Sequence, residues 1–403
     1  MITFALFMIS EIYCKLKTLE GNDLDLKRFV DEIYSDTAAK SFSYNPFNDA
    51  LSSFLIEQKL CRKKATDKLP SWVQANCLFA TVPLEQATSE RVAKAKASLF
   101  KGEKLLSLTG GLGSDECAFS SSFNSIVGLD TDYCLNVLAR INNRLLGLNN
   151  IQRVDDSAEN FLARNNTTFD VIYSDPDRRP GGNRISSDAR LYTPNIFDLY
   201  NQNKQPGERW LTKLSPMTDL TWIRKQFNAP SRIYLFFYKN EIKELLVETA
   251  DSIQDENIIV SVENDDAYTV FDDQNLNPFA KHDFEVFCEL SAASIKAGFG
   301  QKLAENCHWQ TENNGTYYTG KTTVNPALGR CFRIIERLSG SLNEMGETIQ
   351  KLGISQASIS ARDFVADSTE VRKKLGLKDG GENYLFFTGK SKIKKGFVCR
   401  KIG

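Results

Sequence analysis

The sequence LLSLTGGLG at residues 105–113 reads as an apolar strand that runs directly into a glycine-rich turn. Glycines in such a turn let backbone N–H groups approach a ligand where a Cβ would obstruct them. In open sheets of parallel strands, ligands bind beyond the carboxyl ends of the strands, where the strand order reverses. No Gly-Lys-Ser/Thr follows these glycines, so a phosphate-gripping P-loop is not indicated. The stretch predicts a nucleotide-like ligand at the edge of a parallel sheet.

The sequence around this turn alternates apolar strands with helices. Strands are expected at KLLSLTG, NSIVGLD, IQRVDD, FDVIYSD, RWLTKLSP, RIYLFFYK and NIIVSVEN, and a helix at CLNVLARINNRLLGL. Such alternation predicts right-handed βαβ units and a mostly parallel, doubly wound α/β sheet. We expect this Rossmann-like core to occupy residues 99–275.

Other segments flank the core on both sides. Residues 1–98 are expected to form an N-terminal helical domain, because LKRFVDEIYSD, FNDALSSFLIEQKLCRKKA and TSERVAKAKASLF place apolar residues three and four apart. Pro70, in KLPSW, ends any helix that precedes it. After the core, shorter strands and helices predict two small α+β modules, a ferredoxin-like one at residues 276–325 and a second at 326–403.

The charge of the chain is distributed unevenly. The 403 residues are 41% hydrophobic and 25% charged, as in soluble globular proteins of several domains. The net charge of −1 combines +8 for residues 321–403, with 16 lysines and arginines against 8 acids, and −9 for residues 1–320. A basic terminal region on an acidic body suggests a polyanion partner, and a solubilising tail is the alternative.

Cysteine and histidine usage narrows the class of protein. The nine cysteines form no CxxC pair, which argues against a disulfide framework and for a reducing cytoplasm. The two histidines, His282 and His308, are too few and too isolated to support a zinc site or a Ser-His-Asp triad, so no metal is expected. The opening MITFALFMISEIYC lacks the features of a signal peptide, and no stretch predicts a membrane span. We expect a cytoplasmic protein without a membrane partner.

Acidic residues follow the next two predicted strands. Asp130 ends NSIVGLD about 20 residues after the glycines, where a carboxylate can accept both ribose hydroxyls of an adenosine. It could instead cap the following helix, as could Thr131 or Asp132. Asp156 follows the third strand, in position to accept from an adenine amine, although Asp155 competes with it. This pattern fits NAD as well as S-adenosylmethionine.

The end of the fourth strand distinguishes between these cofactors. Asp175 and Pro176 put a carboxylate and a rigid backbone carbonyl where a transferred methyl group would point. An exocyclic amine that donates to both acceptors would aim its lone pair at a methyl carbon held about 3 Å away. Arg178 and Arg179 follow, suited to phosphate contacts or to stacking on a base, with a salt-bridged loop as the alternative. Lys213, which closes the next strand, could contact substrate phosphate or simply be solvated.

These motifs together resemble a known family. The order LTGGLG, GLD, VDD, DPDRR resembles class I S-adenosylmethionine-dependent methyltransferases over roughly residues 98–275, and DPDRR is similar to the [DN]PP[YFW] signature of enzymes that methylate exocyclic amines of bases. KLPSW, LEQATSERVAKAKASL, KLSP, SIKAGFG, PALGRCF and SARDF…VRKKLGLKDGGENYLFF resemble the bacterial THUMP-like-domain methyltransferases over nearly the whole chain. The resemblance implies a ferredoxin-like module and a THUMP-like domain after the catalytic core. THUMP domains in related enzymes bind structured RNA.

The resemblance also implies roles for individual residues. Asp175 and Pro176 would orient the target nitrogen. Two positions depart from the family's pattern: Ser107 replaces an acid that usually grips the cofactor's amine, and Arg178 replaces an aromatic residue that usually stacks on the base. The implied contacts of S-adenosylmethionine are Thr109, Gly110, Gly111, Gly113, Asp130 and Asp156.

We therefore expect an RNA methyltransferase that acts on a base nitrogen of tRNA or rRNA. The alternatives are a non-catalytic RNA-binding protein on a degenerate methyltransferase fold, and a small-molecule or protein methyltransferase. Around the catalytic core, the expected RNA contacts are Arg178, Arg179 and Lys213. In the basic terminal region they are Arg330, Arg333, Arg362, Arg372, Lys373, Lys374, Lys392, Lys394 and Lys395.

Overall fold

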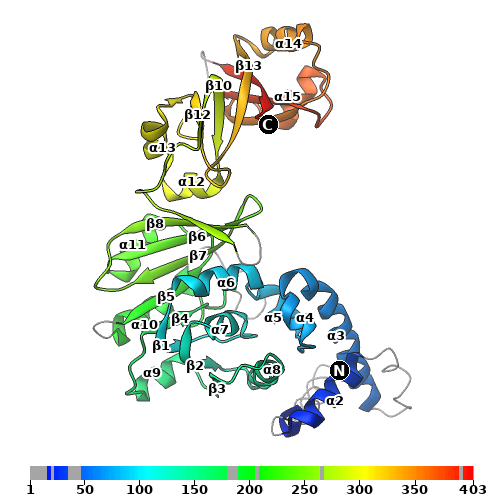
Figure 1. The fold of residues 1–403 in the computed structure, drawn as a ribbon, viewed down its shortest axis with the longest axis vertical. Helices are drawn as coiled ribbons and strands as arrows, with labels where there is room; N and C mark the ends of the chain where they lie inside the picture. Colours follow the sequence, from blue (N-terminus) through cyan, green and yellow to red (C-terminus); the bar gives the residue numbers. More distant parts are fainter. Residues whose placement is uncertain are drawn as a thin grey trace. The chain divides into compact units, whose positions relative to one another are not determined.

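The structure of the chain is a computed structural model, and it describes residues 16–19, 22–34, 47–178, 189–204, 208–263, 267–389 and 394–402 (Figure 1). The chain folds into two compact units. The first unit comprises Met1–Phe236, Glu244–Asp255 and Val262–Thr269, and the second comprises Phe237–Lys243, Glu256–Ser261 and Val270–Gly403. No helix in the described ranges is long and apolar enough to cross a membrane.

A nine-stranded sheet has the order β3-β2-β1-β4-β5-β7-β6-β8-β9. Strands β1 to β5 pair in parallel, and β7 runs antiparallel to β5. The order reverses between β1 and β4, so the fold is the doubly wound α/β architecture that the sequence predicts. The strands are β1 (Gly102–Ser107), β2 (Phe123–Asp130), β3 (Ile151–Asp155), β4 (Val171–Ser174), β5 (Arg209–Leu214), β6 (Ser231–Tyr238), β7 (Glu241–Thr249), β8 (Glu256–Val262) and β9 (Tyr268–Phe271).

Helices connect the parallel strands and cover both faces of the sheet. Figure 1 shows α6 to α8 on one side of β1 to β5 and α9 to α11 on the other, as right-handed crossovers require when the strand order reverses. All four residues of β4 are buried, which is typical of a strand covered on both faces. The connecting helices are α6 (Glu90–Leu99), α7 (Ser114–Phe119), α8 (Tyr133–Leu145), α9 (Ala158–Arg164), α10 (Ile196–Asn203) and α11 (Leu220–Phe227), with a short 3₁₀ helix at Ala189–Leu191.

The N-terminal helices pack against the core of the first unit. Val30 of α2 and Leu55 of α3 share an apolar cluster with Ile141 of α8. Trp72 of α4 belongs to a second cluster that reaches Leu112, inside the glycine-rich turn. Residues of α3, α4 and α5 therefore pack directly against the turn. The N-terminal helices are α2 (Asp23–Tyr34), α3 (Phe47–Lys68), α4 (Pro70–Gln74) and α5 (Thr81–Gln86), with the break between α3 and α4 at Pro70, as predicted.

The second unit contains a seven-stranded sheet in the order β11-β12-β10-β13-β16-β15-β14. One continuous sheet therefore joins the two small α+β modules expected from the sequence. The segment SAASIKAGFGQKLAEN forms two helices, α12 and α13, because Gly298 ends α12 with φ +77°. The strands are β10 (Ala280–Leu290), β11 (Gln310–Thr311), β12 (Tyr317–Thr323), β13 (Gly329–Ser339), β14 (Ser358–Phe364), β15 (Asn383–Gly389) and β16 (Lys395–Lys401). The helices are α12 (Ala292–Ala297), α13 (Gly300–Cys307), α14 (Leu342–Lys351) and α15 (Ser368–Leu375).

The two faces of this sheet carry different side chains. Helices α14 and α15 pack on one face through Met345 and Val371. The other face carries a buried aromatic cluster that includes Phe332 and Tyr317. The Tyr317 hydroxyl of β12 lies 2.8 Å from the Ser360 hydroxyl of β14, although these strands are far apart in the sheet order. The sheet is therefore strongly curved, with the aromatic face inside.

Candidate active site

A pocket of about 410 Å³ lies beyond the carboxyl ends of β1, β4 and β5, where the strand order reverses. All of its lining residues belong to the first unit. Arg179 lies outside the described residues. The predicted site residues that line the pocket are Thr109, Gly110, Gly111, Gly113, Asp130, Asp156, Asp175, Pro176, Arg178 and Lys213.

The glycine-rich turn rests on a buried arginine. A Cβ on Gly110 would lie 2.2 Å from Nη1 of Arg153, so no larger residue fits at this position. Arg153 donates to the carbonyl oxygen of Gly111 at 2.9 Å. Gly113 adopts φ +94° at the start of α7, a conformation that side chains disfavour. The turn is thus fixed by what lies beneath it, with its other side open to the pocket.

Glu116 neutralises this arginine. Its Oε2 atom accepts from Nη1 of Arg153 at 2.6 Å, and both side chains are almost fully buried. Burial raises the pKa of Glu116 above its ordinary value, and Arg153 offsets part of that rise. Ser107, where the family's pattern has an acid, is fully buried beside Glu116. The buried acid near the turn is therefore Glu116, nine positions after Ser107, and it holds the turn through Arg153.

Asp130 holds the turn from the side of the pocket. Its Oδ2 atom accepts from the backbone N–H of Gly111 at 2.8 Å, and its Oδ1 atom accepts from that of Asp132 at 2.9 Å. The cap of α8 is Asp132, which accepts from the N–H of Leu135 at 3.1 Å. Asp130 therefore does not act as the cap of α8. Each of its carboxylate oxygens can accept a further hydrogen bond at the pocket wall.

Asp156 lines the pocket and its competitor Asp155 does not. Asp155 accepts from the side-chain amide of Asn136 at 2.8 Å and pairs with Arg140. Asp156 accepts from the N–H of Ser157 at 2.9 Å and forms an ion pair with Arg164. Of the two acids, the structure brings Asp156 to the position predicted for contact with an adenine.

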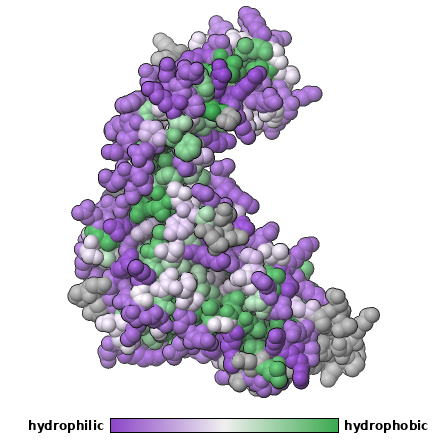
Figure 2. Space-filling view, in the orientation of Figure 1, coloured by the Kyte–Doolittle hydropathy of each residue, from purple (hydrophilic) through white to green (hydrophobic). Residues whose placement is uncertain are grey.

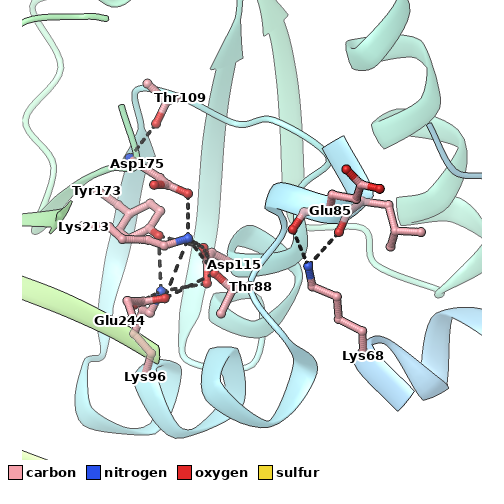
Figure 3. A network of polar contacts seen from close by, with 11 residues as sticks. Lys68, Glu85, Thr88, Lys96, Thr109, Asp115, Tyr173, Asp175, Lys213 and Glu244 are labelled. Carbon is pink, nitrogen blue, oxygen red and sulfur yellow. Dashed lines mark hydrogen bonds and ion pairs between the residues drawn. The ribbon is translucent and has the colours of Figure 1, made fainter. Parts of the chain in front are cut away.

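Asp175 is held from two directions (Figure 3). Its backbone N–H donates to the Thr109 hydroxyl at 2.6 Å, which ties the end of β4 to the glycine-rich turn. Nζ of Lys213 donates to its Oδ2 atom at 2.7 Å and to the hydroxyl of Thr88 at 2.9 Å. The carboxylate is about one-third exposed, and Figure 3 shows its second oxygen turned away from Lys213. Lys213 is therefore occupied inside the site, which weighs against the prediction that it contacts substrate phosphate.

A buried network of charges lies behind Lys213. Lys96 of α6 is fully buried and pairs with Asp115 at 2.9 Å and with Glu244 of β7. The hydroxyl of Tyr173 donates to Asp115 at 2.7 Å. Lys213 lies 3.7 Å from Glu244 and 4.0 Å from Asp115. The network thus groups two lysines with the carboxyl groups of Asp115, Glu244 and Asp175.

Burial and charge pairing set the ionisation of this network. Burial opposes ionisation of Asp115, but Lys96 and Lys213 outweigh it and lower the pKa of Asp115 to about 2. Burial raises the pKa of Glu244, and the same lysines offset that rise in part. Burial alone would lower the pKa of Lys213, but Asp175, Glu244 and Asp115 raise it above its ordinary value. Lys213 therefore stays protonated at neutral pH.

The segment before α6 contributes one wall of the pocket. Gln86, the last residue of α5, lines it together with Ala87 and Thr88, which follow that helix directly. Lys68, from KLPSW, donates to the backbone carbonyls of Leu84 and Glu85 at 2.7 and 2.8 Å, and so fixes the end of α5. Burial, together with the charge of Lys213, lowers the pKa of Lys68 to about 8.

The pocket is rich in acids. Seven of its lining residues are acidic and two, Arg178 and Lys213, are basic. Arg153, Lys96 and Arg164 pair with three of the acids from outside the lining. The charge of the lining favours a cationic ligand and disfavours a polyanion inside the pocket. Arg178 is exposed. The acidic lining residues are Asp115, Glu116, Asp130, Asp156, Glu159, Asp175 and Asp177.

Several predicted RNA contacts in the second unit are used in internal ion pairs. Arg362 lies 3.1 Å from Glu289, and Arg330 pairs with the same carboxylate. Arg372 lies 2.5 Å from Asp379. Lys395 lies 2.7 Å from Glu312. By contrast, Lys373 and Lys374 are exposed in the last turn of α15, and Lys392 lies outside the described residues.

Sequence reasoning missed the residues beneath the pocket. No role is predicted from the sequence for Arg153, Glu116, Lys96 or Asp115. A signal for Lys96 exists in TSERVAKAKASLF, where it lies four residues after Val92 and three after Ala93, on the buried face of α6.

Comparisons with known proteins agree with this fold. Residues 329–401 match the family described as THUMP domain-like. An uncharacterised S-adenosylmethionine-dependent methyltransferase of Mycobacterium tuberculosis is 24% identical over 335 residues, which is 81% of this chain and 89% of that protein. The crystal structure of a candidate methyltransferase from Porphyromonas gingivalis W83 superposes with a TM-score of 0.74, at 24% identity and 98% coverage of both chains.

The resemblance noted in the sequence is thus confirmed for the fold and for the terminal domain. The first unit has a methyltransferase fold, and the chain carries a THUMP-like domain at residues 329–401, within the range 326–403 expected for it. The M. tuberculosis relative bears the name of the enzyme class that the motifs predict.

Proposed function

We propose that this protein is an S-adenosylmethionine-dependent methyltransferase that modifies RNA at a base nitrogen. The observation that carries the proposal is the juxtaposition of the glycine-rich turn with Asp175 across one pocket, through the hydrogen bond between Thr109 and the Asp175 N–H. This contact joins the predicted cofactor site to the predicted methyl-transfer site.

The pocket fits the cofactor in shape and in charge. Gly110 lets the turn pack directly on Arg153, which fills the space that a Cβ would take, and this packing shapes the floor of the pocket. Asp130 and Asp156 line the pocket as acceptors for ribose hydroxyls and an adenine amine. S-adenosylmethionine carries a sulfonium cation, which suits a lining with seven acids and two bases.

Asp175 orients the nucleophile. When bound, S-adenosylmethionine supplies an electrophilic methyl group, so the protein's task is alignment and not metal chemistry. Lys213 fixes one carboxylate oxygen of Asp175, and the other accepts an N–H of the substrate amine. The bound cofactor would supply the methyl group and keep the electrons of its sulfur–carbon bond, and Asp175 or water would accept the proton that the methylated amine loses.

RNA is the proposed substrate because of the terminal domain. The THUMP-like match covers residues 329–401, in the region that carries a net charge of +8. Arg178 at the pocket suits a phosphate or the plane of a base. The acid-rich pocket would admit a neutral base and keep the phosphate backbone outside it.

The test is methyl transfer from tritiated S-adenosylmethionine into total RNA of a strain that lacks the gene. The wild type should label a discrete RNA, and Asp175→Ala should label it at least 100-fold more slowly. Asp155→Ala is the matched control, since Asp155 ends β3 of the same sheet but does not line the pocket. Label that enters protein or small molecules in place of RNA would overturn the substrate assignment, and equal labelling by Asp175→Ala would overturn the role of Asp175.

A further inference from the structure

Arg333 and Arg400 lie directly opposite each other on β13 and β16 of the second unit. Both side chains are exposed. Their neighbours Phe332 and Cys399 belong to the aromatic cluster, so the alternation along each strand directs both arginines to the other face of the sheet. Like charges directly opposite in an antiparallel pair are destabilising. The fold thus tolerates an electrostatic cost at this position.

The two arginines lack the acidic partners that other cations of this unit have. Arg330 and Arg362 pair with Glu289, and Arg337 pairs with Glu285 and Glu312. In the described part of the chain, no ion pair to a carboxylate is recorded for Arg333 or Arg400.

The contacts that Arg333 and Arg400 make with other residues do not neutralise their positive charges. The guanidinium of Arg333 lies 4.9 Å from the ring centre of Phe284. Arg400 donates from Nε to the side-chain oxygen of Asn383 at a long 3.4 Å. Phe284 is itself half-buried, and the ring of His282 lies 4.7 Å from it. An aromatic surface therefore adjoins the guanidinium group of Arg333.

We propose that Arg333 and Arg400 together bind a phosphodiester of the RNA substrate, with Phe284 and the guanidinium plane of Arg333 available to an adjacent base. This inference deepens the proposed function and rests on it. Two arginines opposite each other on adjacent strands can both donate to one phosphate, and the anion removes the repulsion between them. Figure 2 shows a mainly hydrophilic surface on the visible face of this unit.

RNA fits this surface better than an acidic protein segment does. Carboxylates could also pair with the two arginines, but they would leave the half-buried ring of Phe284 without a role. A nucleotide offers both groups at once, because its phosphate can reach the arginines while its base stacks. The position on an exposed strand pair also suits a backbone contact, which fixes register and carries no sequence information.

The experiment measures RNA affinity of the full-length protein by fluorescence anisotropy, with bulk tRNA and ribosomal RNA fragments, across a series of salt concentrations. Arg333→Gln with Arg400→Gln should weaken binding about tenfold, and the slope of log Kd against log salt should fall by about one to two. Phe284→Leu should weaken binding with the slope unchanged, because it removes stacking and no charge. The control is Lys302→Gln with Lys351→Gln, which removes two exposed lysines of α13 and α14 and should change binding by less than twofold.

Thermal melting without RNA separates a binding role from a structural one. Removal of two opposed like charges should leave Tm unchanged or raise it, whereas a structural pair would lower Tm. Equal RNA binding by the arginine variant and the lysine control would overturn the proposal and leave the proposed function intact. A wild type that binds no RNA would overturn both, and equal competition by polyglutamate would show that the surface takes acidic polypeptide instead.

Discussion

Nζ of Lys213 lies 2.7 Å from Oδ2 of Asp175, and this ion pair links the candidate active site to the buried charges behind it. Lys213 reaches Thr88 as well, at 2.9 Å, and is surrounded by Glu244 and Asp115. The lysine therefore has a fixed position, and it fixes one oxygen of Asp175 in turn. The second oxygen is the one that can meet a substrate amine. Asp175 acts as an oriented acceptor in this arrangement.

Replacement of Lys213 tests whether this orientation matters. Lys213→Met should lower kcat of methyl transfer about 100-fold or more, because Asp175 loses its partner and can rotate. Lys213→Arg keeps the charge and should recover part of kcat. KM for S-adenosylmethionine should change much less than kcat in both variants. Steady-state kinetics across pH 6–9 provide the measurement, and a loss confined to KM would contradict the positioning role.

The buried Lys96 should matter for stability more than for chemistry. Lys96→Met leaves Asp115 and Glu244 without their shared partner, and removal of one member of a buried ion pair costs about 3 kcal/mol of unfolding free energy. Lys94→Met on the same helix is the matched control, since that lysine is 47% exposed and pairs with Glu90 one turn away. Its cost should stay below about 0.5 kcal/mol. Urea unfolding measures both, and equal costs would refute the assignment.

The pH dependence of this stability follows from Asp115. The pKa of Asp115 is lowered from 3.8 to about 2 in the folded state, so its ion pair stabilises the fold above pH 4 and this contribution disappears as pH falls toward 2. The difference in unfolding free energy between the wild type and Lys96→Met should narrow over that interval. A difference that stays constant down to pH 2 would show that the pair does not depend on ionised Asp115.

The glycine-rich turn should tolerate no side chain at Gly110. Gly110→Ala places a Cβ 2.2 Å from Arg153, so either the turn or the buried arginine must move. Affinity for S-adenosylmethionine should fall at least tenfold in calorimetry. Gly147→Ala controls for backbone strain alone, because Gly147 has φ +72° with nothing within 4 Å of the added Cβ. The Gly147→Ala variant should bind S-adenosylmethionine with the affinity of the wild type. Wild-type affinity in the Gly110→Ala variant would contradict the role given to the turn.

Replacement of Asp155 and replacement of Asp156, at the end of β3, should affect cofactor binding differently. Asp156→Asn should weaken binding of S-adenosylmethionine about tenfold. The asparagine side chain is uncharged and has only one oxygen that can accept a hydrogen bond from the adenine amine. Asp155→Asn should bind it normally, since Asp155 meets Asn136 and Arg140 and not the pocket. The reverse order of affinities would assign the adenine contact to Asp155.

Much of the fold is readable from the sequence because the apolar patterns are strong. The seven core strands expected from the sequence appear as β1 to β6 and β8, and the glycine-rich turn follows β1 as the motif predicts. Strand β7 was not expected. Its sequence EIKELLVET is rich in residues that favour helices, and its pairing with β5 is a tertiary effect.

The residues that support the site were harder to predict from the sequence than the residues that line it. Asp130 and Asp175 end strands, and strand ends are visible in a sequence. Arg153 and Glu116 meet beneath the turn only after β3 and α7 have packed, from positions 37 residues apart in the chain. Similarly, nothing in the sequence shows that Arg362 is neutralised by Glu289, because that contact forms across the curved sheet of the second unit.

Single-turnover methyl transfer with Asp175→Asn tests the central claim most directly, with the cofactor bound in advance and RNA added in excess. The variant keeps the shape of the side chain but loses the charge that Lys213 holds. We predict a cofactor Kd within about threefold of the wild type, and a transfer rate at least 100-fold slower. A variant that transfers methyl groups to RNA at the rate of the wild type would contradict the account, because Asp175 would then not orient the nucleophile.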